Sequence, residues 1–295
     1  MQDKLTPRQS RAWGLCALSV PAAMVLAGRG WLWVLAGSAA AGGIVLFLQT
    51  LQRRSGQSLP EQMARAFGRR SGRLLGAAVC LWLLLAASGA AAASQIAFED
   101  DLGPLASAVP LLLATLASRK GQAAAARVSG VLALCLALLY SIIALASLRH
   151  VQAAWCRPWG SAADAGLSLC LCLTPACLLF LDGDGQTPRP GWSALAAAVL
   201  PGVAALLCSA CLSPAWTAQL PQPLYTLTKS LSVLSVMQRF ELLLSTAQLL
   251  GLVSLLTLLV CAAARTAEAC LGAGWGEKKE GVFCLLAFGV SFLTQ

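Results

Sequence analysis

Charged residues are scarce in this sequence. Only 11% of its 295 residues are Asp, Glu, Lys or Arg, whereas a soluble domain of ordinary composition has about 25%. So few polar groups cannot cover the surface of a globule in water, which excludes a soluble enzyme and a disordered chain. Hydrophobic residues make up 58% of the sequence and the mean hydropathy is +0.74. The composition therefore predicts a polytopic membrane protein.

Histidine is almost absent. His150 is the only one, and the sequence has no nucleophile elbow or phosphate-binding loop. Cys208-x-x-Cys211 has the spacing of a redox or zinc motif, but it lies inside a predicted span with no histidine nearby. We therefore expect no enzyme, no metal site and no cofactor. Most of the twelve cysteines lie inside apolar runs, where a thiol packs as a small hydrophobic group. They predict no disulfide framework.

Long apolar runs predict that residues 1–295 form a single all-α integral membrane domain. A helix needs about 20 apolar residues to cross the hydrocarbon, and the runs indicate about nine such spans. The third, fifth and eighth are long and nearly free of charge, whereas the fourth and ninth are short. The predicted spans are 12–28, 31–48, 74–97, 105–117, 128–148, 165–181, 194–212, 242–264 and 282–293.

The net charge of +9 predicts an orientation rather than nucleic-acid binding. With a cytoplasmic N-terminus, sixteen of the 21 Lys and Arg residues fall in inner segments and five in outer ones. This bias follows the positive-inside rule, so we expect the N-terminus inside and the C-terminus outside. The five outer residues are Arg29, Arg149, Arg157, Lys229 and Arg239.

Two of the segments between the predicted spans have a sequence pattern that predicts a helix. Residues 58–73 predict a cytoplasmic surface helix, with a solvated basic loop against anionic lipid as the alternative. Residues 213–240 form the longest outer segment, in which leucines recur at helical spacing. This pattern predicts an amphipathic helix that either packs on the bundle or docks a partner. The leucines are Leu224, Leu227, Leu231 and Leu234.

Helix-breaking residues lie inside two of the predicted spans. Pro21 frees a backbone carbonyl, so the first span is expected to kink or unwind around residues 17–19. The sixth span contains Pro175 and ends at Asp182 and Gly183. Paired broken helices are typical of a ligand site at the midplane of a transporter. The alternatives are a simple kink at Pro21 and a polar loop at Asp182.

Several short motifs follow one another in the order seen in a known family. The stretches are Leu5-Thr-Pro-Arg-Gln9, Ala27-Gly-Arg-Gly-Trp31, Arg119-Lys-Gly121 with Ala126-Arg127, Pro223-Leu-Tyr225, and Gln238-Arg239-Phe-Glu241. Together they resemble the spore germination permeases. These are the B-type integral membrane subunits of nutrient germinant receptors, within the amino acid–polyamine–organocation transporter superfamily.

The resemblance implies an inverted-repeat bundle like that of the leucine transporter, with the first and sixth helices unwound at the ligand. Here residues 184–190 follow the sixth span directly and no tenth span follows 282–293, so the second repeat is expected to be incomplete. The candidate ligand contacts are Gly14, Leu18, Ser19, Pro21, Phe180, Asp182 and Gly183. The residues carrying the partner or structural signature are Arg119, Gly121, Arg127, Tyr225, Arg239 and Glu241.

The resemblance implies a sensing function in the inner membrane of the spore or the cell membrane. The expected role is that of a germinant-receptor subunit that binds a small nutrient, an amino acid in the first instance. The implied partners are the A-type and C-type receptor subunits and the lipid bilayer. Two alternatives are an amino-acid secondary transporter and a degenerate scaffold subunit that binds no ligand.

Overall fold

The computed structural model describes residues 5–55, 59, 62, 66, 68–102, 105–181, 192–231, 240–271, 282–283 and 285–287. Every regular element in these ranges is a helix, which confirms the all-α class. The predicted site residues Asp182, Gly183 and Arg239 lie outside the described residues, as do the side chains of Pro21 and Glu241.

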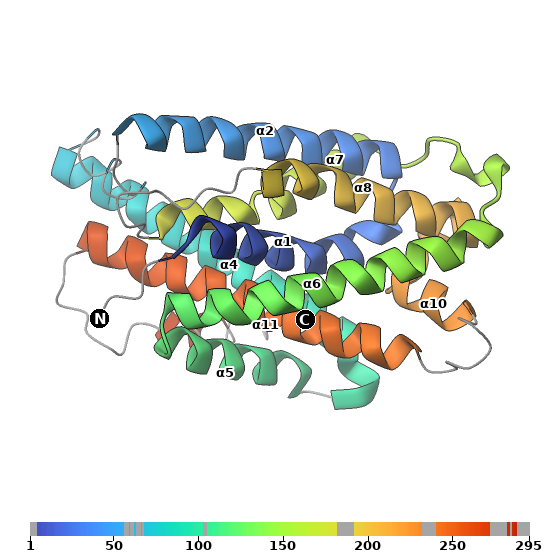
Figure 1. The fold of residues 1–295 in the computed structure, drawn as a ribbon. Helices are drawn as coiled ribbons and strands as arrows, with labels where there is room; N and C mark the ends of the chain where they lie inside the picture. The colour runs from blue at the N-terminus through green and yellow to red at the C-terminus, as the bar shows by residue number, and fades with distance from the viewer. Residues whose placement is uncertain are drawn as a thin grey trace.

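The long helices lie side by side in one bundle, and short helical turns connect them (Figure 1). The long helices are α1 (Pro7–Met24), α2 (Trp31–Ser55), α4 (Gly68–Leu102), α5 (Leu105–Arg119), α6 (Gln122–Ser147), α7 (Ala162–Cys172), α8 (Trp192–Leu212) and α11 (Phe240–Leu271). The short elements are η1 (Leu26–Gly28), η2 (Leu148–His150), η3 (Ala153–Cys156), η4 (Thr174–Phe180), α9 (Pro214–Thr217) and α10 (Pro223–Ser230).

Within the described residues, five segments are long and apolar enough to cross a membrane. They are Trp31–Gln52, Ser71–Ser94, Gln122–His150, Ala162–Phe180 and Leu243–Glu268, and they match the predicted second, third, fifth, sixth and eighth spans. The fourth and seventh predicted spans correspond to the shorter apolar helices Ala106–Arg119 and Val199–Leu212. The first falls on α1 and η1, and most of the ninth lies outside the described residues.

Helix α6 shows which solvent surrounds the bundle. Five of its large apolar side chains, spaced along one face, are between 60% and 71% exposed. In water such a row would be a large apolar patch, whereas lipid chains solvate it without cost. Such an exposed apolar row suits contact with lipid, consistent with a membrane protein. Its members are Val128, Val131, Leu134, Leu138 and Leu145.

The helices form two groups that meet along α1. Helix α2 packs against α7 and α8, and we call these three the α2 group. Helix α11 packs against α4 and α5, and we call these three the α4 group. Helix α1 contacts α8 on one side and α11 on the other, with α6 laid along both α1 and α11 (Figure 1).

Small residues let the helices approach closely around α1. Trp13 and Ala17 of α1 have no exposed surface and share one core cluster with Ala87 of α4, Cys177 of η4 and Ala262 of α11. Because lipid offers no hydrophobic driving force between helices, such close van der Waals packing holds the bundle together. The ten cysteines whose side chains are described are all free thiols.

The first span was expected to kink or unwind, and the unwinding is wrong. Helix α1 runs without interruption from Pro7 to Met24, through residues 17–19. A proline removes only one backbone hydrogen bond, and neighbouring helices can hold the rest of the helix in place. The neighbours of α1 surround it closely enough to do this, since Trp13, Ala17 and Leu18 are fully buried.

The sixth predicted span does change its helical type. Helix α7 ends at Cys172, and the chain continues as the 3₁₀ helix η4 with Pro175 in its first turn. Pro175 has no N–H to continue the α-helical ladder, which accounts for the change. The 3₁₀ helix ends at Phe180 and Leu181 is extended. These residues directly precede Asp182 and Gly183, where the sixth span was predicted to end.

In the segment predicted to lie outside, the described residues 213–231 pack on the bundle. Leu224, Leu227 and Leu231 in and after α10 are at most 6% exposed and lie in a cluster with Cys208 of α8 and Leu244 of α11. This confirms the first of the two sequence alternatives for the leucine face. Leu234 lies outside the described residues.

The predicted cytoplasmic helix 58–73 is wrong in its last six residues, 68–73. Helix α4 begins at Gly68, so residues 68–73 are the first turns of a spanning helix rather than part of a separate one. Gly68 has a φ of +74°, a conformation that glycine adopts without strain.

Candidate functional site

The described members of the predicted ligand set lie where α1 packs on α7 and η4. Gly14 is buried, Leu18 and Ser19 are at most 4% exposed, and Phe180 is 6% exposed. Leu18 packs in a cluster with Cys172 of α7, while Phe180 shares the cluster of Trp13 and Ala17. Residues of the predicted ligand set that are more than 150 positions apart in the sequence thus lie on neighbouring helices. In this conformation their side chains fill the space between the helices.

The 3₁₀ helix is tied to the end of α2. The Gln52 side-chain amide donates to the Leu179 carbonyl at 3.1 Å, and Gln52 is 1% exposed. At the start of η4, the Thr174 hydroxyl donates to the Leu171 carbonyl at 2.9 Å. A backbone carbonyl that loses its helical partner inside lipid must be satisfied by another group, and Gln52 supplies one to η4.

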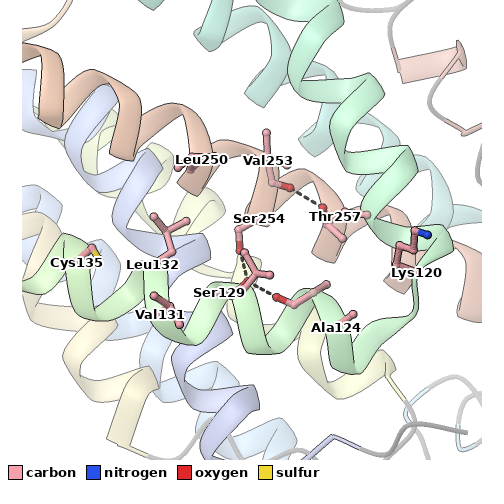
Figure 2. A pocket seen from close by; sticks show the side chains of 13 residues that line it. Lys120, Ala124, Ser129, Val131, Leu132, Cys135, Leu250, Val253, Ser254 and Thr257 are labelled. Atoms are coloured by element: carbon pink, nitrogen blue, oxygen red, sulfur yellow. Dashed lines mark hydrogen bonds between the residues drawn. The ribbon is translucent and has the colours of Figure 1, made fainter.

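A row of polar groups joins α1 to α6 and α11. The indole N–H of Trp13 donates to the Ser254 carbonyl at 3.1 Å. The Ser129 and Ser254 hydroxyls lie 2.7 Å apart and point at one another (Figure 2). Further along α6, the Tyr140 hydroxyl donates to the Ser19 carbonyl at 3.3 Å. These bonds crosslink the helices and hold α1 against both of them.

This polar row offers hydrogen bonds rather than acid–base chemistry. Its side chains are hydroxyls and an indole, and none of them is charged at neutral pH. Among the residues that the structure describes, no three His, Cys, Asp or Glu side chains lie close enough to hold a metal ion.

An open pocket lies where α1 ends. Its volume is about 280 Å³, and three parts of the chain form its walls. Met24, Val25, Gly28 and Arg29 come from the end of α1 and from η1, Ala93 comes from α4, and residues 218–223 come from the α9–α10 segment. The pocket is polar enough for a small solute because the Arg29 side chain, 51% exposed, stands at its wall.

Asp164 is a central residue that the sequence reading did not single out. It is 8% exposed and accepts hydrogen bonds from the backbone N–H groups of Gly30, at 3.3 Å, and Ser161, at 3.1 Å. Its carboxylate also lies 3.8 Å from the Arg29 guanidinium. Ser161 and Asp164 form a capping box at the start of α7. The spacing Ser-x-x-Asp before an apolar run was the signal that could have revealed it.

The residues of the partner signature are spread over the molecule. Arg119 ends α5, Gly121 makes the turn into α6 with a φ of +97°, and Arg127 is exposed on α6. Tyr225 is half-buried on α10, near the opposite end of α6 (Figure 1). The structure therefore separates this set into one group at the α5–α6 turn and one at α10.

The chain matches no family model, and no curated protein is significantly similar to it in sequence.

Proposed function

We propose that the chain is the membrane subunit of a spore germinant receptor and that it senses a small nutrient. The observation that supports this best is the position of α1, held between the α2 group and the α4 group. A helix in that position can pass a movement at one end to both groups. The ordered motifs of the sequence point to the same family.

The open pocket at the end of α1 lies outside in the predicted orientation, and we call it the outer pocket. It is the proposed point of nutrient contact. Its volume of about 280 Å³ is near the lower end of the range for small-molecule sites, about 300–1,000 Å³, which fits a free amino acid. An arginine guanidinium pairs with a carboxylate through two parallel hydrogen bonds. Arg29 has five N–H donors, and its Nη1 lies 3.8 Å from the Asp164 carboxylate.

A nutrient in this pocket touches the end of α1, α4 and the α9–α10 segment at once. Binding therefore favours the arrangement of these parts that fits the nutrient best, and shifts the population of the receptor toward it. In the arrangement so favoured, α1 separates from η4 and exposes Gly14, Leu18, Ser19 and Phe180 to the nutrient. The A-type and C-type subunits read the movement at α10 and at the cytoplasmic turns.

Thermal unfolding of the purified chain with amino acids, sugars and nucleosides tests this function. We expect an amino acid to raise the unfolding temperature by several degrees, because a ligand at 100 times its Kd adds about 2.7 kcal/mol. Arg29→Ala should abolish the shift. Arg149→Ala, which removes another exposed arginine, should leave it unchanged. The sensing function is abandoned if no nutrient of the panel raises the unfolding temperature.

Uptake of the stabilising nutrient into proteoliposomes separates sensing from transport. A sensor binds the labelled nutrient without accumulating it in the vesicles. Uptake above that of empty vesicles would instead favour the amino-acid secondary transporter. A chain that binds no nutrient but co-purifies with A-type or C-type subunits would be the scaffold.

A further inference from the structure

A long groove runs along the lipid-facing side of the bundle, between α6 and α11. Its volume is about 660 Å³, and Ala117 of α5 lines it together with residues of α6 and α11; Figure 2 shows the side chains that line it. The groove exists because the residues along it are small. Ala117 of α5 and Ala124, Ala125 and Ser129 of α6 leave a furrow beside the larger Leu132.

The walls of the groove suit a hydrocarbon chain. The Ser129 and Ser254 hydroxyls are bonded to each other at 2.7 Å, and the Thr257 hydroxyl donates to the Val253 carbonyl at 2.6 Å. The hydroxyls of the floor are thereby satisfied within the protein (Figure 2). Val128 and Val131 complete an apolar rim that is itself exposed to lipid.

The length of the groove matches one leaflet of a bilayer. From Ala124 to Cys135 the wall follows α6 for twelve residues, whose eleven rises of 1.5 Å span about 16.5 Å. Half of a hydrocarbon core of about 30 Å is about 15 Å. One acyl chain lying along α6 therefore reaches from the interface to the midplane.

A positive charge stands at the interfacial end. Lys120 lines the groove one turn before Ala124 and is exposed. The turn at Gly121, with its φ of +97°, places Lys120 between the end of α5 and the start of α6. In the predicted orientation this end is cytoplasmic, and the cytoplasmic leaflet carries the anionic lipids that attract lysine.

We propose that this groove binds a phospholipid with an anionic headgroup. One acyl chain lies along α6 and α11, and the phosphate lies beside the Lys120 ammonium. The lipid is distinct from the nutrient of the proposed function, because the outer pocket and this groove share no lining residue. It fills a furrow between α6 and the α4 group that the described side chains leave open.

Native mass spectrometry of the purified full chain tests this site with two lipids that have the same chains. We expect dipalmitoyl phosphatidylglycerol to bind about fivefold more than dipalmitoyl phosphatidylcholine, the ratio that one interfacial lysine provides. Lys120→Ala should reduce the ratio to about one while the chain still binds. Arg73→Ala, which removes an exposed charge of the same predicted membrane face, should keep the ratio.

A pair of phenylalanine variants tests the groove itself. Ala124→Phe places a ring in the furrow and should remove most of the bound lipid. Leu134→Phe, on the exposed row of α6 outside the groove, should bind as much as the unaltered chain. If Ala124→Phe does not fold, a phosphatidylglycerol with a photoactivatable group at its chain end gives a second measurement. That group should label the wild-type chain between Val131 and Cys135.

The proposal is overturned by equal binding of the two lipids to the unaltered chain, or by full lipid binding to Ala124→Phe. Detergent as the only molecule in the groove, or a dimer that forms through it, would also overturn the proposal. So would photolabelling that does not reach residues 131–135.

Discussion

Asp164 connects three parts of the molecule, at the end of the bundle where α1 ends and α7 begins, through one carboxylate. It caps α7 and accepts a hydrogen bond from Gly30 at the start of α2, and it pairs with Arg29 at the wall of the outer pocket. A buried acceptor of this kind fixes the backbone that surrounds it, because the N–H groups would otherwise be left unsatisfied. The position of Arg29 in the pocket thus depends on a residue of another helix.

Replacing Asp164 with alanine should destabilise the protein by about 2 kcal/mol, from the lost cap and the unpaired N–H of Gly30. Arg29→Ala should cost less than about 1 kcal/mol, because that side chain is half exposed and its ion pair is screened. Denaturant unfolding in detergent micelles measures both free energies. Equal losses would mean that the ion pair, and not the bonds to the backbone, carries the stabilisation.

Gly30 marks the closest approach between two distant segments. A Cβ at this position would collide with the Trp159 carbonyl oxygen and lie 2.8 Å from the Gly160 Cα. Gly30→Ala should therefore force the two backbones apart and destabilise the fold by about 1–3 kcal/mol. Gly43→Ala is the control, since a Cβ there meets nothing within 4 Å, and it should be neutral or stabilise by up to about 1 kcal/mol.

Heating followed by size-exclusion chromatography reports the fraction of folded protein for both glycine variants. The close approach would be refuted if Gly30→Ala survived heating as well as Gly43→Ala.

At the scale of elements, the sequence predicted what depends on local pattern. The leucine spacing of 224, 227 and 231 predicted an amphipathic helix that packs on the bundle or docks a partner, and the leucines in and after α10 pack on the bundle. The long uncharged runs predicted α4, α6 and α11 as spanning helices, and each contains a segment that can cross a membrane. Helical periodicity and span length are set by nearest neighbours and by bilayer thickness, so one sequence suffices for both.

What depends on contacts between distant segments was harder to predict. Pro21 alone favoured an unwound first helix, but the buried surroundings of Trp13 and Leu18 hold α1 helical throughout. At Pro175, by contrast, the α-helix does not continue: the 3₁₀ helix η4 follows α7, and Gln52 of α2 donates a hydrogen bond to the Leu179 carbonyl. Whether a proline breaks a helix in lipid depends on which neighbours satisfy the freed groups, and those neighbours are not adjacent in sequence.

At the scale of the whole molecule, the basic residues are distributed unequally between the two predicted faces of the membrane. Lys120 at the α5–α6 turn and Arg149 after α6 mark opposite ends of one helix that can cross the membrane. The sixteen basic residues predicted inside, against five outside, favour the end with Lys120 on the cytoplasmic face. In that predicted orientation the proposed lipid groove would lie in the inner leaflet and the proposed nutrient pocket on the outer surface, so the two sites would act from opposite sides.

Reporter fusions at the two ends of α6 test this orientation. A green fluorescent protein joined after Lys120 should fluoresce, because it folds in the cytoplasm, and alkaline phosphatase at the same position should be inactive. After Arg157 we expect the reverse, since one further spanning segment, Gln122–His150, separates the two positions. An additional fusion after Arg53 should behave like the one after Lys120 if the bias of basic residues determines the topology. The opposite pattern at all three positions would invert the molecule in the membrane, and would place Arg29 and the pocket beside it on the cytoplasmic side, where no external nutrient reaches them.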